Sequence, residues 1–300
     1  MKNKTYLENK EIQNSVNKNL AVEIENIPAM SKKASKYEAK IIRKNNKPHK
    51  AVLEQPEILP NEIIKLFNVS KSYTNNYINY HILRDINLTI YEKEFVVIYG
   101  PSGSGKTTLL SIISALDRPT TGYSHVVNQN TITLNESKLT KLRANYIGYI
   151  YQQYGLLEIL TVEDNIKITA SLQKDKSKKI DLDDLLKYVG LYEHKHKKAS
   201  QLSGGQSQRV AICRALIKNP KILFGDEPTG AIHIDATKQI MNLFLKINKE
   251  YGTTIVIVTH NQNMLQLGDR VIKVQDGKIV ENYLNKKRVP VEEISWDDQE

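Results

Sequence analysis

Short apolar runs of strand length recur along the chain and end at glycine or polar residues. The clearest are Phe95–Tyr99, Ile222–Phe224 and Ile255–Val258, and a further one begins at Val271. Runs this short, rich in β-branched and aromatic residues, are typical of strands buried inside a sheet. The strand runs therefore predict an α/β core.

Two other regions differ from this pattern. Residues 62–121 predict an antiparallel edge sheet together with one core strand and a helix, and residues 123–132 return as a further strand. From about residue 161 to residue 219 apolar positions follow helical spacing, as in Leu182, Leu185, Leu186 and Val189. This spacing predicts a mostly α-helical subdomain over 161–219.

A glycine-rich turn directly follows the Phe95–Tyr99 strand and precedes a predicted helix. In that setting backbone N–H groups and the positive end of the helix converge on the β- and γ-phosphates of a nucleotide. Lys106 adds positive charge, and Thr107 is positioned to ligate Mg²⁺. The residues predicted to bind phosphate are Gly100, Pro101, Ser102, Gly103, Ser104, Gly105, Lys106, Thr107 and Thr108. A turn without a ligand is the alternative, and each further motif weakens it.

A second glycine motif, Leu202–Gln206, precedes another predicted helix and marks a second anion-binding helix start. Its predicted ligand-binding residues are Ser203, Gly204, Gly205 and Gln206. Neither helix start can enclose a nucleotide alone. The pair suggests that phosphates are clamped between two molecules arranged head to tail.

Two carboxylates stand at the end of the Ile222–Phe224 run. A buried strand delivers such groups to the carboxyl edge of a sheet. We expect Asp226 to hold the magnesium shell and Glu227 to act as the general base toward the attacking water. Adjacent acids are often only a solvated turn, but the apolar run before this pair favours function.

With these motifs the chain resembles the ATP-binding subunits of ABC transporters, over about Ile63 to Tyr283. The resemblance implies a P-loop NTPase core with an antiparallel β subdomain and an α-helical subdomain. It also implies ATP and Mg²⁺ as cofactors, and hydrolysis that drives a conformational change in a separate membrane permease. In this family two such domains form a sandwich that encloses ATP, so a second ATPase subunit is implied, identical or different.

The same resemblance assigns further residues. Gln152 falls at the glutamine that touches the magnesium or the attacking water, and His260 at the switch histidine that contacts the γ-phosphate. Both join Glu227 and Lys106 as predicted catalytic residues, and Gln152 joins Thr107 and Asp226 as a predicted metal ligand. Tyr73 matches the aromatic residue on which the adenine ring stacks, although it also suits ordinary packing. A histidine at a strand end is otherwise more often a hydrogen-bonded surface residue.

Within the family, the segments 116–122 and 148–157 and Gly230 resemble ATPases that serve lipoprotein-releasing, macrolide-exporting and FtsX-like permeases. This implies an FtsX-like permease as partner, facing residues from just after Gln152 up to Asn165. It further implies a peripheral location at the cytoplasmic face of the cell membrane.

One position departs from the family pattern. After Pro228–Ala231 the family usually continues Leu-Asp, whereas this chain has Ile232 and His233. The missing aspartate belongs to a loop that crosses the dimer. We hypothesise that His233 marks a slowed or asymmetric site; Asp235 could substitute, and tolerated drift is the alternative.

Composition divides the chain further. Its 300 residues, 40% of them hydrophobic, suffice for an ample core. Residues 1–60 carry 12 Lys and Arg against 7 Asp and Glu, half of the net charge of +10. Without regular apolar spacing they predict a basic, disordered N-terminal extension. Residues 61–285 are the predicted ATPase domain, and residues 286–300 a predicted acidic, mobile C-terminal tail.

The extension has few aromatic residues to stack on bases, and interspersed Glu residues dilute its charge. No specific nucleic-acid partner is therefore expected, and anionic lipid is the contact that suits its charge. No segment approaches the roughly 20 apolar residues of a membrane span. The only cysteine, Cys213, excludes a disulfide framework and a thiol metal site.

Two alternatives of other classes stay open. A soluble ABC ATPase acting on ribosomes or DNA would suit the positive charge, but such proteins usually carry two ATPase units or a long insertion. A nucleotide-gated module with slow or no turnover would suit His233. That hypothesis must then explain why the full set of predicted catalytic residues is present.

Overall fold

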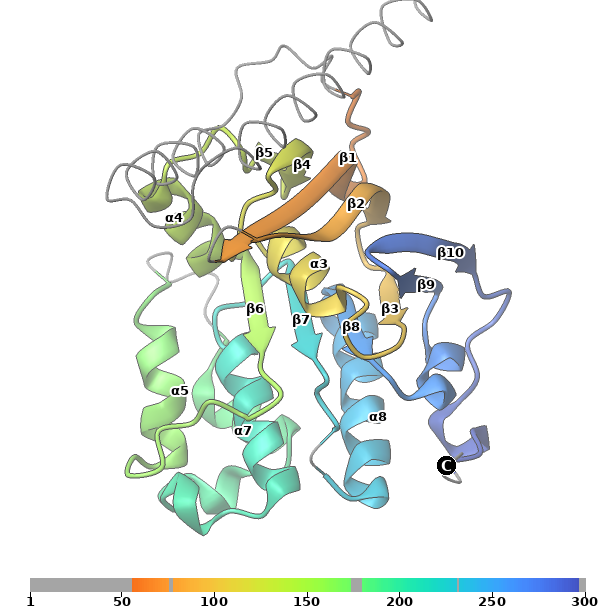
Figure 1. The fold of residues 1–300 in the computed structure, drawn as a ribbon. Helices are drawn as coiled ribbons and strands as arrows, with labels where there is room; N and C mark the ends of the chain where they lie inside the picture. The colour runs from red at the N-terminus through yellow and green to blue at the C-terminus, as the bar shows by residue number, and fades with distance from the viewer. Residues whose placement is uncertain (1–55, 76–77, 174–179, 231, 297–300) are drawn as a thin grey trace, which may run out of the picture. The chain divides into compact units, whose positions relative to one another are not determined.

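The computed structural model describes residues 56–75, 78–173, 180–230 and 232–296 (Figure 1). Two compact units divide the chain, one formed by residues 51–71 with 81–300 and the other by residues 1–50 with 72–80. In the second unit, Thr74 donates a hydrogen bond to the side chain of Asn79. Residues 1–55 of the predicted N-terminal extension lie outside the described residues.

In the described part of the chain, ten strands form two sheets. The strands are β1 (Glu62–Asn75), β2 (Ile78–Tyr91), β3 (Phe95–Tyr99), β4 (Thr121–Val126), β5 (Gln129–Asn130), β6 (Ile147–Ile150), β7 (Ile222–Asp226), β8 (Thr254–Thr259), β9 (Arg270–Gln275) and β10 (Lys278–Leu284). One sheet has the order β2-β1-β4-β5, and β4 pairs antiparallel with both of its neighbours. The other has the order β10-β9-β3-β8-β7-β6 and is parallel except for the β9–β10 pair. The α/β prediction is confirmed.

Among the described residues, six α-helices and four short 3₁₀ helices connect the strands. The α-helices are α3 (Lys106–Ile113), α4 (Glu136–Tyr146), α5 (Val162–Ala170), α6 (Leu182–Tyr188), α7 (Gly204–Leu216) and α8 (Ile234–Tyr251). The 3₁₀ helices are η2 (Tyr192–His194), η3 (Ala199–Gln201), η4 (Gln262–Leu267) and η5 (Val291–Glu293). Helices α5, α6 and α7 fall within the range predicted as a helical subdomain, and α5 packs on α7 (Figure 1).

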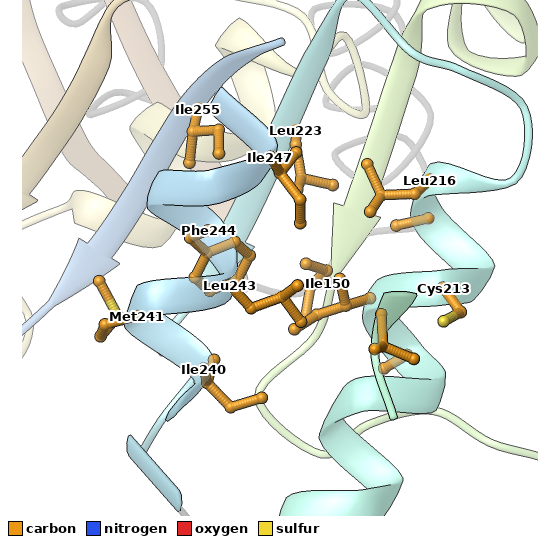
Figure 2. Close-up of a cluster of buried hydrophobic side chains, with 14 of the residues drawn as sticks. Ile150, Cys213, Leu216, Leu223, Ile240, Met241, Leu243, Phe244, Ile247 and Ile255 are labelled. Carbon is orange, nitrogen blue, oxygen red and sulfur yellow. The ribbon is translucent and has the colours of Figure 1, made fainter. Parts of the chain in front are cut away.

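The central strands β3, β7 and β8 are buried on both faces, which explains why they read as continuous apolar runs. Side chains alternate along β3: Phe95 and Val97 join the core shared with α7 and α8, whereas Val96 and Ile98 join the core shared with α3. Figure 2 shows the first of these cores, with Phe244 of α8 among side chains of β6, β7 and α7. The sheet is thereby fixed between two apolar layers, and its strand ends are rigidly placed.

The C-terminal segment differs from the predicted acidic tail. Val291, Ile294 and Trp296 are buried against α8 and the surrounding core, and the indole Nε1 of Trp296 donates to the carbonyl of Val291 at 2.9 Å. Arg288 anchors the start of the segment on Asp269. The acidic composition concealed these few apolar contacts, so the prediction of a mobile tail is wrong for residues 286–296. The last four residues lie outside the described part of the chain.

Candidate active site

The predicted catalytic residues follow the carboxyl ends of neighbouring strands. β3, β8, β7 and β6 are parallel, with Tyr99 opposite Thr259, Asp226 opposite Val258 and Ile150 opposite Gly225. Carboxyl ends of parallel strands share one edge of a sheet, the usual location of ligand sites in such folds. The loops after all four strands therefore meet at one edge.

The turn after β3 begins α3 with a backbone shape that glycine permits. Gly105 is the N-cap of α3 at φ 100°, and a Cβ on Gly100 would lie 2.0 Å from the carbonyl oxygen of Val274. Lys106 is buried, and its Nζ donates to the carbonyls of Gly100 and Pro101, each at 2.8 Å. No side chain of the described residues caps the start of α3, so its N–H groups and positive helix end are open to an anion.

Thr107 and Asp226 meet beside this turn. The hydroxyl of Thr107 donates to Oδ1 of Asp226 at 3.4 Å, and Asp226 also accepts a hydrogen bond from Tyr149 of β6. Burial, followed by the nearby charge of Glu227, raises the pKa of Asp226. Hydroxyl and carboxylate oxygens are hard ligands that fit Mg²⁺, which takes few protein ligands and completes its shell with phosphate and water. The described residues contain no cluster of three or more His, Cys, Asp or Glu that could hold a metal.

Glu227 and His260 are paired across the ends of β7 and β8. Oε2 of Glu227 lies 2.7 Å from Nδ1 of His260. Glu227 adopts φ 48°, an uncommon conformation for a residue other than glycine, and its N–H donates to the carbonyl of Val258. Its side chain is 20% exposed, whereas that of His260 is 67% exposed. A carboxylate held near solvent by a histidine is suited to accept a proton from water.

Gln152 and Tyr73, the other two residues assigned by resemblance, are both exposed. Gln152 is exposed in a turn two residues beyond β6, at the edge that carries Asp226. Tyr73 is 42% exposed and belongs to the unit formed with residues 1–50, so its contact with adenine stays a prediction.

The second glycine motif forms an exposed helix start. Ser203 caps α7: its Oγ accepts from the N–H of Gln206 at 3.4 Å, and the Gln206 side chain accepts from the N–H of Ser203 at 3.0 Å. Ser203 and Gly204 are exposed. This reciprocal cap orients the first turn of α7 while its positive end faces outward.

A cleft of about 470 Å³ opens at this helix start. It is lined by Ser203, Gly204, Gly205, Gln206, Arg209, Ile232, His233, Ala236 and Gln239. The sequence did not single out Arg209, although its position four residues after Gly205, on the same face of α7, was a usable signal. His233 is the N-cap residue of α8, has an exposed side chain, and its Nδ1 lies 3.9 Å from Asp235.

The cleft and the phosphate-binding turn are separate, as the two halves of the predicted shared site would be. None of the residues 100–108 lines the cleft at Ser203, within the part of the chain that the structure describes. Each half presents an open helix start, which is what a nucleotide clamped between two copies requires.

In the parts of the chain that the structure describes, none of the helices has both the length and the apolar character that crossing a membrane needs.

Comparison with known proteins agrees with this geometry. Residues 83–230 match the family model described as "ABC transporter". A putative ABC transporter ATP-binding protein of Mycoplasma pneumoniae, the MG468.1 homolog, is 50% identical over 89% of this chain and 92% of its own length. The lipoprotein-releasing system ATP-binding protein LolD 1 of Rhodopseudomonas palustris is 38% identical over 73% of this chain and 98% of its own length.

A solved structure shows the same fold. The dimeric, post-hydrolysis structure of the ATP-binding cassette MJ0796 of Methanocaldococcus jannaschii, bound to ADP and Pi, aligns with a TM-score of 0.68 and 39% identity. The alignment covers 74% of this chain and 98% of that one.

Proposed function

Because this chain belongs to the family of ABC transporter ATP-binding proteins, we propose that two subunits close on ATP and that its hydrolysis moves a separate membrane permease. The chain is an ATPase of this family, similar to the LolD group. The observation that carries the proposal is the exposed, capped start of α7, which is separate from the phosphate-binding turn. Each ATP then lies between residues 100–108 of one subunit and Ser203–Gln206 of the other.

In the proposed reaction Lys106 turns from its backbone carbonyls toward the β- and γ-phosphates, to which the N–H groups at the start of α3 also donate. Thr107, Asp226 and Gln152 would hold Mg²⁺, which neutralises phosphate charge when bound. Glu227 orients the attacking water and accepts its proton. His260, held by Glu227, donates toward the γ-phosphate.

For the membrane partner we propose an FtsX-like permease that docks on the loop after Gln152 and on α5, at the cytoplasmic face of the membrane. Large apolar side chains are exposed there, as expected of a surface covered in a complex. They are Leu157, Ile159 and Ile168, with Tyr151 just before the loop and Leu172 just after α5. Tyr73 is proposed to stack on adenine, and residues 1–60 to contact anionic lipid.

Mixing two inactive variants tests the shared site. Lys106→Ala disables the turn, and Ser203→Glu places a carboxylate where the partner's phosphates would lie, so each variant alone is expected to hydrolyse ATP poorly. A mixed pair contains one intact site, made from the turn of one chain and the α7 start of the other. We expect phosphate release by the mixture to exceed that of either variant.

Absence of this rescue, while the unmutated chain is active, would contradict a site shared between subunits.

For the membrane partner, we expect this chain to copurify with a polytopic membrane protein. Hydrolysis stimulated by nucleic acid would instead favour an ATPase acting on ribosomes or DNA.

The substitution His233→Asp tests whether the histidine that replaces the family's aspartate, in the loop after β7, slows hydrolysis. We expect steady-state phosphate release of the assembled transporter to rise about fivefold, which corresponds to one hydrogen bond of about 1 kcal/mol regained across the dimer. The exposed Asp235 lies nearby, so Asp235→Asn is measured in parallel to test whether it already substitutes. Unaltered turnover of His233→Asp would favour tolerated drift.

A further inference from the structure

The chain that follows β10 returns toward η4 and α8 (Figure 1). Residues 285–296 form a strap there, and its first residue contacts the carboxyl end of η4. The side-chain amide of Asn285 donates to the carbonyls of Leu265 and Gly268, each at 2.8 Å. The last carbonyls of a helix have no partner within the helix, so Asn285 satisfies groups that η4 cannot satisfy itself.

Other contacts anchor the strap independently of the Asn285 side chain. The N–H of Val289 donates to the carbonyl of Gln266 at 3.0 Å, and Arg288 forms an ion pair with Asp269. Further along, Trp296 is buried in the core that also contains side chains of η4 and α8. We therefore expect the strap to stay in place when the side chain of Asn285 is changed.

η4 is a helix that depends on contacts from outside. At six residues it is longer than most 3₁₀ helices, whose hydrogen bonds are poorly aligned. Met264 and Leu267 fix its inner face, since both are buried in the core. The amide of Asn285 holds its carboxyl end. Loss of that amide should therefore let the end of η4 shift.

The amino end of η4 continues directly from the catalytic pair. Asn261 is the N-cap of η4: its side chain accepts from the N–H of Asn263 at 2.8 Å, and its own N–H donates to Oγ1 of Thr259 at 3.0 Å. His260 stands between these two bonded residues. Its Nδ1 lies 2.7 Å from Oε2 of Glu227. A shift of η4 is therefore passed to the imidazole of His260.

η4 also contacts the loop that follows Glu227. Oγ1 of Thr229, two residues after Glu227, donates to Sδ of Met264 at 3.9 Å, and both residues are buried. η4 thus contacts the loop beyond Glu227 and continues the chain beyond His260. Its placement bears on the separation of the two side chains.

We propose that Asn285 is a positioning residue for His260. By holding the carboxyl end of η4, its side-chain amide keeps the imidazole against Glu227, in the place from which His260 reaches the γ-phosphate. This inference rests on the proposed function, because it gives the strap a part in ATP hydrolysis. The phosphate-binding turn is held by its own contacts, so Asn285 acts on kcat and not on the affinity for ATP.

The test compares Asn285→Leu with Asn242→Leu in the full chain. Leucine keeps a branched side chain but donates no hydrogen bond. Asn242 is a matched control because its amide donates to Oε1 of Glu292 at 2.7 Å, a bond that joins α8 to the strap and does not involve η4. Asn285→Gln keeps both amide donors on a longer side chain. Thermal unfolding reports on any general loss of stability.

Three measurements separate positioning from a structural role. Steady-state phosphate release gives kcat and KM, and equilibrium titration with a fluorescent ATP analogue gives the affinity. NMR of the chain with isotope-labelled histidine reports on the His260 ring without any nucleotide. The signal of His260 is assigned among those of the seven histidines with His260→Gln.

For Asn285→Leu we expect kcat to fall about 10-fold, since misplacing a reacting group is costly, while the affinity for ATP stays within about twofold of the parent. The His260 signal should shift. Asn285→Gln should recover part of kcat, and Asn242→Leu should behave like the parent. An unchanged His260 signal in Asn285→Leu, or an equal fall of kcat in Asn242→Leu, would overturn the positioning role.

Asn285→Ala, which leaves space for water at the two carbonyls, carries the same test if Asn285→Leu fails to fold. The same His260 signal then decides the outcome. If the unmutated chain released no phosphate, the proposed function would fall. The His260 signal would still decide whether Asn285 places the imidazole.

Discussion

Replacing Glu227 by glutamine is expected to lower ATP hydrolysis by about 100-fold or more, since a positioned general base contributes roughly 10²- to 10⁴-fold. Glutamine keeps the shape of the side chain and can still hydrogen-bond His260, which lies 2.7 Å from Glu227. It cannot accept the proton of the attacking water. The phosphate-binding turn and the start of α7 are untouched, so ATP should still bind.

Phosphate release and ATP binding are measured on the same preparation, with the exposed Glu293→Gln as a control that also removes one negative charge, outside the predicted site. Loss of both activities in Glu227→Gln would point to a folding defect. Undiminished release would show that another group takes the proton. If the unmutated chain assembled with its permease released no phosphate, the nucleotide-gated module would become the better description.

Trp296→Ala is expected to reduce the free energy of unfolding by about 3 kcal/mol, at the lower end of the range for truncating a buried aromatic residue. The indole is 5% exposed and packs with Val291 and Ile294 against the core that includes α8. The lower end applies because a terminal segment can detach and so limit the cost. The segment packs on α8, which begins directly after His233. Loosening the segment is therefore expected to destabilise the ATPase domain itself.

Chemical unfolding followed by far-UV circular dichroism measures the change. Trp296→Phe retains most of the apolar contact and should lose less, and the exposed Glu293→Gln is expected to be nearly neutral. Because Trp296 is the only tryptophan, its fluorescence in the unmutated chain reports directly on docking of the segment. Full stability of Trp296→Ala would show that the segment does not contribute to the fold.

Much of the candidate site could be predicted because its parts are local. A glycine turn between strand and helix, a Ser-capped helix start and two acids at a strand end are each specified by a few consecutive residues. Their chemistry follows from backbone N–H groups and carboxylates that the sequence names directly. The α/β class likewise followed from strand runs such as Phe95–Tyr99, which the structure buries on both faces.

Contacts between distant segments could not be predicted in this way. The tail was expected to be mobile because its acidic residues outnumber its apolar ones, yet Val291, Ile294 and Trp296 find an apolar surface on α8. The addition of Arg209 to the cleft depended on how α7 and α8 pack together.

The sequence by itself predicted which groups would bind phosphate and magnesium and which carboxylate would receive the proton, because each motif is a short stretch whose conformation its own glycines, caps and strand set. Tertiary structure alone decided that Glu227 lies against His260, that the described residues 100–108 do not line the cleft at Ser203, and that Arg214 of α7 donates to the carbonyl of Tyr154. Those pairings join residues far apart in the chain, and only the packing of helices on the sheet brings them within hydrogen-bond distance.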